Sequence, residues 1–112
     1  MFNIIKIGEK EIPMLAMAST DLYYKRVFHE DAIKMQAKEM DEGDLINFIM
    51  KVGFVMAKQA EKADMKTLNE DSFIEWLDGF DRSDYISSLP DIRLTYEGQR
   101  VPSSDEKKSP VE

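Results

Sequence analysis

The side chains best suited to chemistry are carboxylates, and they gather at residues 69–84, where the sequence reads NEDSFIEWLDGFDRSD. Such runs can hold Ca²⁺ when oxygen ligands alternate along a loop, as in an EF-hand. At that spacing, however, ligand positions fall on Phe73 or Phe80, so the motif fails. Two interpretations remain: a solvated face on an acidic helix, or a surface that meets a basic partner.

Other catalytic or metal-binding patterns are missing from the sequence. The only histidine, His29, has no cysteine and no second histidine to complete a metal site, and it lies where a first helix is expected to end. The chain contains no glycine-rich phosphate loop, nucleophile elbow or HExxH motif. We therefore expect no enzymatic activity, no cofactor and no metal.

Chain length and net charge narrow the classes of domain organisation and binding partner that remain. With 112 residues the chain is long enough for one compact domain, and a net charge of −7 disfavours DNA and RNA as partners. The absence of cysteine fits a reducing cytoplasm. The N-terminus does not read as a signal peptide, and the apolar stretch at residues 45–57 is interrupted by polar residues and shorter than the roughly 20 residues of a membrane span.

The N-terminal residues 2–15 predict a β-hairpin, because isoleucine-rich segments flank a turn near Gly8. Pro13 cannot donate a ladder hydrogen bond, which places the second strand at an edge or ends it early.

Two short helices are expected next. Ser19 or Thr20 can cap a helix that begins at Asp21. Residues 31–40 predict a second, peripheral helix, which residues 41–43 should stop. The first helix is expected to bury Leu22, Tyr23, Val27 and Phe28, and the second to align Ile33, Ala37 and Met40.

The strongest pattern lies at residues 44–63 and predicts a central helix. Apolar residues on several faces of its first half indicate that this half is surrounded, whereas lysines and glutamate return the second half to water. Gly53 in its interior costs about 1 kcal/mol relative to alanine, which a close crossing by a neighbouring element would justify. The residues at helical spacing are Leu45, Phe48, Ile49, Val52, Val55, Met56 and Ala60.

Asn69 is expected to cap another helix, and Ser83 to start a last one that Pro90 must begin, kink or break. The pattern as a whole predicts a mainly α (α+β) fold, with an N-terminal β-hairpin followed by four to five helices. Residues 1–98 should form the single domain and residues 99–112, rich in serine, proline and charge, a flexible tail.

Aromatic and methionine residues are the candidate contacts with a partner protein, because such side chains dominate the energetics of interfaces and can adapt to irregular surfaces. The same residue types also fill cores, and the sequence alone leaves both possibilities open. The candidates are Tyr23, Tyr24, Met35, Met40, Phe73, Trp76 and Phe80.

Several segments resemble the tail assembly chaperones of siphophages and of prophages in Gram-positive bacteria. The similarity spans roughly residues 4–100, most clearly in KVGFVMAKQAEK at 51–62 and NEDSFIEWLDGFD at 69–81, and also in KIGEKEIPM, YYKRVFHEDAIK and LTYEGQ. The resemblance implies a non-catalytic protein of the host cell cytoplasm that coats the long tape measure protein and helps recruit tail tube subunits. It also implies self-association.

Two alternatives have the same composition. One is a structural head or tail component, which mass spectrometry of purified virions would detect, whereas a chaperone should be absent from them. The other is an acidic regulator that mimics DNA, which should bind a DNA-binding enzyme in a salt-sensitive manner.

Overall fold

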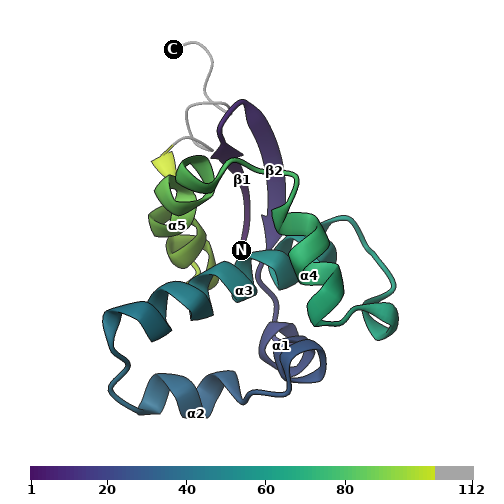
Figure 1. The fold of residues 1–112 in the computed structure, drawn as a ribbon, viewed down its shortest axis with the longest axis vertical. Helices are drawn as coiled ribbons and strands as arrows, with labels where there is room; N and C mark the ends of the chain where they lie inside the picture. Colours follow the sequence, from purple (N-terminus) through teal and green to yellow (C-terminus); the bar gives the residue numbers. More distant parts are fainter. Residues whose placement is uncertain (103–112) are drawn as a thin grey trace.

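The computed structural model describes residues 1–102 and confirms the predicted fold class. An antiparallel hairpin is followed, within these residues, by five α-helices and one 3₁₀ turn (Figure 1). The elements are β1 (Phe2–Ile7), β2 (Lys10–Leu15), α1 (Thr20–Phe28), α2 (Ala32–Ala37), α3 (Glu42–Ala60), η1 (Met65–Thr67), α4 (Glu70–Leu77) and α5 (Arg82–Tyr96).

The hairpin turns at Gly8, as predicted. Ile7 pairs with Lys10 across a two-residue loop, and Gly8 has φ of 64°, a value that suits glycine at the first central position of a tight hairpin turn. A Cβ at Gly8 would also lie 2.5 Å from Asp84 Oδ2, because the start of α5 packs against the turn. Pro13 remains paired with Ile4, in a two-stranded sheet where both strands are edges.

Helix α3 crosses the middle of the molecule and supplies more of the buried hydrophobic residues than any other element (Figure 1). All six residues at positions 52–57 are buried, so this part of the helix is enclosed on every side. Leu45 and Ile46, near the N-terminus of the helix, are only partly buried. The expectation of a surrounded first half, which extended to Ala57, therefore holds for Phe54 and Ala57 but not for Ile46 and Met50. Glu61 and Lys62 are exposed, as expected.

Gly53 is required by a close helix crossing, as expected. A Cβ at this position would lie 2.8 Å from Tyr85 Oη and 3.2 Å from Ile92 Cδ1, both on α5. The Tyr85 hydroxyl donates a 2.8 Å hydrogen bond to the Met50 carbonyl, which fixes the two helices at this point.

Helix α1 begins where predicted, but its cap and its buried face differ. Ser19 makes no side-chain cap, and its hydroxyl instead accepts a 3.1 Å hydrogen bond from the Gln59 side chain. Thr20 accepts a 2.8 Å hydrogen bond from the Met17 amide and donates one of 2.7 Å to Gln59. Val27 and Phe28 are buried as predicted, but Leu22 is 71% exposed, and Tyr24 takes its place as a fully buried residue.

Helix α2 is short and peripheral, as predicted, but its expected apolar face is wrong. Ile33 and Ala37 are exposed, and Ala32 is the residue it buries. Residues 41–43 do not stop α2: they start α3, whose first turn is capped by the Asp41 carboxylate accepting from the Asp44 amide.

The last two helices confirm one prediction and correct another. Asn69 caps α4 in a capping box with Ser72. Pro90 neither begins nor breaks α5, which starts after its cap at Asp81 and continues through the proline to Tyr96.

The chain beyond α5 returns to the hairpin. Buried Asn3 donates 2.9 Å hydrogen bonds to Thr95 Oγ1 and to the Gln99 carbonyl, and Val101 is fully buried. Residues 99–102 therefore belong to the packed domain, which corrects the boundary placed at residue 98. Residues 103–112, the remainder of the expected tail, lie outside the described residues.

Candidate protein-binding groove

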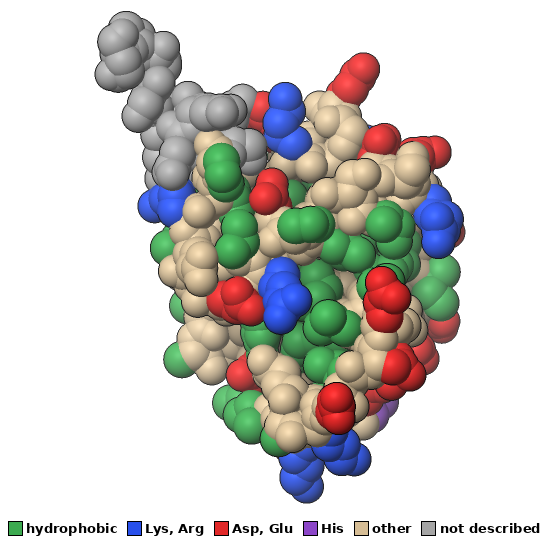
Figure 2. Space-filling view, turned by 90° about the vertical axis from the view of Figure 1, so that its left-hand side faces the viewer, with side chains coloured by type: hydrophobic (Ala, Val, Ile, Leu, Met, Phe, Trp, Pro, Cys, Tyr) green, Lys and Arg blue, Asp and Glu red, His purple; other side chains and the backbone are tan. Residues whose placement is uncertain are grey.

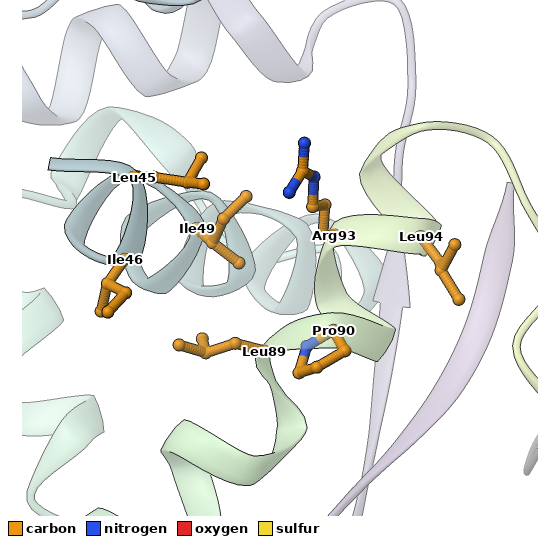
Figure 3. A pocket seen from close by; sticks show the side chains of 7 residues that line it. All are labelled: Leu45, Ile46, Ile49, Leu89, Pro90, Arg93 and Leu94. Atoms are coloured by element: carbon orange, nitrogen blue, oxygen red, sulfur yellow. The ribbon is translucent and has the colours of Figure 1, made fainter. Parts of the chain in front are cut away.

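An apolar groove runs between the N-terminal half of α3 and the second half of α5 (Figure 3). Its volume is about 390 Å³, enough for several aliphatic side chains of another protein. We call it the α3–α5 groove, lined by Leu45, Ile46, Ile49, Leu89, Pro90, Arg93 and Leu94.

The sequence builds this groove because both helices carry more apolar residues than the core can enclose. On α3, Leu45 and Ile49 are four residues apart and share one face, with Ile46 beside them. Helix α5 buries one face, formed by Tyr85, Ser88, Ile92 and Thr95, against α3 and the hairpin. Its other face, with Pro90 and Leu94, is turned to the groove.

Two further hollows extend the groove at either side. One, toward α4, shares Ile46 with the groove and adds Met50, Leu77, Phe80 and Ile86. The other, toward α2, shares Leu45, Ile49 and Arg93, and adds Gln36 and Met40. Figure 2 shows hydrophobic side chains gathered on this face of the molecule, with carboxylates around them. The surface is therefore a continuous band and not a set of isolated apolar residues.

Charges lie at defined places around the band. Among residues 1–102, Arg93 is the only charged residue that lines the groove, and its Nε donates a 3.1 Å hydrogen bond to Glu97 one turn later. Asp41, one turn before Leu45, and Glu42 and Asp44 bring carboxylates to the start of α3. At the start of α5, the Ser83 hydroxyl and amide hold the pKa of Asp81 below its usual value.

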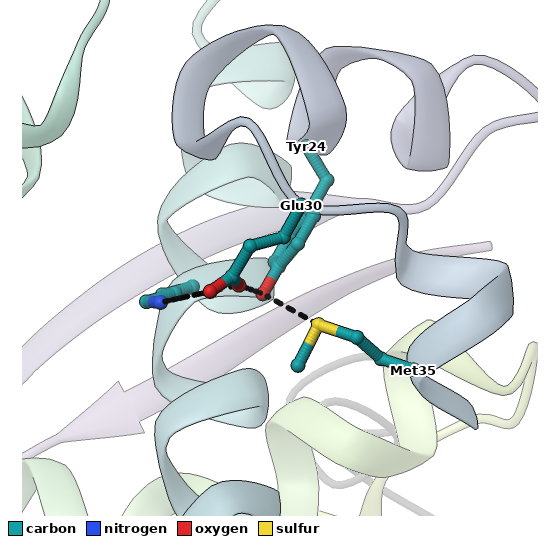
Figure 4. A network of polar contacts seen from close by, with 4 residues as sticks. Tyr24, Glu30 and Met35 are labelled. Carbon is teal, nitrogen blue, oxygen red and sulfur yellow. Dashed lines mark hydrogen bonds and ion pairs between the residues drawn. The ribbon is translucent and has the colours of Figure 1, made fainter. Parts of the chain in front are cut away.

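A polar network fixes the chain between α1 and α2 beside the band (Figure 4). The Tyr24 hydroxyl donates a 2.9 Å hydrogen bond to Glu30, which also pairs with Lys51 of α3 at 3.2 Å. Burial, and then the contact with Glu30, raises the pKa of Tyr24 far above its ordinary value. Its hydroxyl therefore stays protonated and acts as a structural donor.

A second polar contact holds α2 itself. The Tyr96 hydroxyl donates to Asp21 of α1 and accepts a 2.9 Å hydrogen bond from Gln36 of α2. Burial is the main cause that raises the pKa of Tyr96, followed by the hydrogen bond to Asp21. Helix α2 thus depends on polar contacts more than on apolar burial.

Two of the predicted contact residues cannot meet a partner in this structure. Tyr24 is fully buried, with its ring 5.3 Å from that of Phe48, and Phe73 is buried against Phe28 and Phe54. Both belong to the core because the apolar faces of α1 and α4 turn inward there. We therefore remove them from the candidate surface.

The other predicted residues are half-buried and lie at separate places. Met40 and Phe80 line the two hollows that extend the groove. Met35 contacts the Tyr24 hydroxyl, Trp76 packs on Phe54 and Tyr85, and Tyr23 lies under the Arg26 guanidinium. Only Met40 and Phe80 thus adjoin the α3–α5 groove.

None of the residues that line the groove was predicted from the sequence as a contact with a partner. Because Pro90 was expected to begin, kink or break the last helix, the sequence did not align Leu94 with Leu89 and Pro90 on one face. A usable signal was present in α3, where Leu45 and Ile46 exceed what one buried face needs.

Among residues 1–102, no group of three or more histidine or acidic residues is placed to hold a metal ion. Within the same range, no helix combines the length and apolar character needed to cross a membrane. His29 ends α1 as an exposed residue in the left-handed conformation.

Comparison of the chain with protein-family models, with curated protein sequences and with solved structures gave no significant match.

Proposed function

We propose that the protein is a tail assembly chaperone that holds helical segments of the phage tape measure protein in the α3–α5 groove. The observation that carries this proposal is the groove itself, an open apolar channel between two helices of a small acidic domain. The similarity of residues 51–62 and 69–81 to such chaperones supports the choice of partner.

The geometry suits an amphipathic helix as the bound element. Apolar side chains of α3 form one wall and those of α5 the other, so a helix lying between them would bury residues spaced three and four apart. A tape measure protein is a long helical rod whose apolar stripes would aggregate if left bare. Covering those stripes is the chaperoning step.

The net charge suits the second part of the role. A coat of subunits that each carry a formal charge of −7 keeps loaded rods apart through like-charge repulsion. Tail tube subunits would then replace the chaperone along the rod as the tube grows, without any covalent chemistry.

Co-expression with fragments of the tape measure protein from the same genome tests the proposal. We expect the wild-type protein to raise the soluble yield of at least one fragment, and Leu94→Asp to abolish that gain by placing a charge in the groove. Leu22→Asp is the matched control, because Leu22 is exposed on α1 and away from the groove. Circular dichroism must show both variants folded, and Ile46→Asp replaces Leu94→Asp if that variant unfolds.

The proposal is wrong if every fragment is equally soluble with and without the protein. If Leu22→Asp and the groove variants lose the gain in soluble yield equally, the binding surface is not the α3–α5 groove.

A further inference from the structure

Within the part of the chain that the structure describes, Arg93 is the one cation that lines the α3–α5 groove. It lines both the groove and the hollow toward α2, between Leu89 and Leu94 on its own helix and Leu45 and Ile49 on α3. Figure 3 shows its guanidinium extending from α5 into the space beside the α3 side chains. A helix docked in the groove would therefore cover it.

The bonding capacity of Arg93 is largely unused. Its Nε donates to Glu97, but neither terminal nitrogen donates to any group of residues 1–102. The pair with Glu97 is half-exposed, so water now solvates the rest of the guanidinium. Docking an apolar helix would remove that water and leave strong donors without acceptors, which is costly.

We propose that the groove selects helical segments that carry a carboxylate facing Arg93, in line with their apolar stripe. The inference rests on the proposed function and specifies the chemistry of the bound segment. Arginine and carboxylate form paired, charge-assisted hydrogen bonds, and such a pair in an apolar setting sets the register of a complex and rejects segments that lack it.

The acidic start of α3 gives the segment a direction. Asp41 lies one turn before Leu45 on the same side of the helix, and Glu42 and Asp44 are beside it. A carboxylate on the segment is repelled there and a lysine or arginine is attracted. The preferred segment thus has its acidic residue at Arg93 and a basic residue toward Asp41.

Binding assays with overlapping helical segments of the tape measure protein test the inference, using the full-length chain. The tightest segments should share an acidic residue beside the apolar stripe, and replacing it by arginine should weaken binding about tenfold or more. Arg93→Glu should weaken the original segments by a similar factor and restore binding of the arginine-substituted ones.

Two variants separate this contact from net charge and folding. Glu97→Gln removes the carboxylate that competes for Arg93, so it should tighten binding of the acidic segments. Arg26→Glu makes the same charge change on α1, over Tyr23, and should leave binding within about twofold. Arg93→Glu should lower the thermal unfolding temperature only slightly, because the pair with Glu97 is half-exposed and the new glutamate adds one like-charge contact at the end of α5.

The outcomes distinguish the two claims. If no segment binds the wild-type protein, the proposed function fails and this inference fails with it. If segments bind and Ile46→Asp abolishes binding, but exchange of charge at Arg93 changes nothing, only the inference is overturned.

Discussion

The two parts of α3 differ in how they use the same kind of residue. Positions 52–57 are enclosed by α1, α4, α5 and the hairpin, and they carry the fold. At positions 45–50 only Phe48 and Ile49 are buried, and the partly covered residues form one wall of the groove. One continuous apolar pattern thus supplies the core at one end and a wall of the proposed binding groove at the other. This contrast predicts that stability and binding can be changed separately.

The largest expected effect comes from truncating the enclosed part. Phe54→Ala should lower the free energy of unfolding by about 3–5 kcal/mol, because a fully buried ring that packs on Phe28, Phe73 and Trp76 leaves a cavity. Ile46→Ala, in the groove, should cost less than about 1 kcal/mol. Urea unfolding followed by circular dichroism measures both, and similar losses at the two sites would erase the contrast.

A smaller loss is expected from adding one methyl group at the helix crossing. Gly53→Ala should destabilise the protein by about 1–3 kcal/mol, because the new Cβ would lie too close to Tyr85 and Ile92. Gly43→Ala is the matched control in the first turn of the same helix, where the nearest atom is 3.6 Å away. There we expect no loss, or a slight gain from helix propensity. A gain at both positions would show that α5 does not cross α3 closely.

The boundary of the groove toward α2 can be tested through Tyr96. Tyr96→Phe removes the hydrogen bonds to Asp21 and from Gln36, so stability should fall by about 1 kcal/mol. Amide exchange should accelerate in α2 while the enclosed part of α3 stays protected. Tyr23→Phe should change neither quantity. Uniform acceleration across both helices would mean that α2 is not separately held.

The smallest expected effect is the loss of folding stability as the pH is lowered. Hydrogen bonds from backbone amides of α2, chiefly the Lys34 amide, lower the pKa of Asp31. The hydrogen bond from the Ser83 hydroxyl lowers the pKa of Asp81. The resulting stability is present above the usual value of 3.8 and is lost as the pH falls through the lower, folded value. The Asp31→Asn and Asp81→Asn double variant keeps neutral caps. Its urea midpoint should therefore fall less than that of the wild type between about pH 7 and pH 3.

Local signals in the sequence were sufficient to predict the strands and helices of the fold. The structure confirms the turn indicated by Gly8, the helix cap indicated by Asn69 and the close helix crossing indicated by Gly53. Which residue faces inward was harder to predict. On α1 the apolar spacing allowed Leu22 or Tyr24 to be buried, and packing on α3 selected Tyr24.

The candidate site depended on contacts between distant segments and could not be read from either one alone. Pro90 was expected to begin, kink or break the last helix, and α5 instead continues through it from Arg82 to Tyr96. The burial of Val101 depends on Asn3, which binds residues nearly 100 positions later. Neither effect has a local signature.

Methyl NMR of the full-length protein, titrated with a tape measure segment, tests the central claim most directly. Binding in the groove predicts shifts at Leu45, Ile46, Ile49, Leu89 and Leu94. Leu22, Ile33 and Ile74 are more exposed apolar residues outside the groove, and their methyl signals should not move. Shifts confined to those three residues, with the groove signals unchanged, would contradict the account.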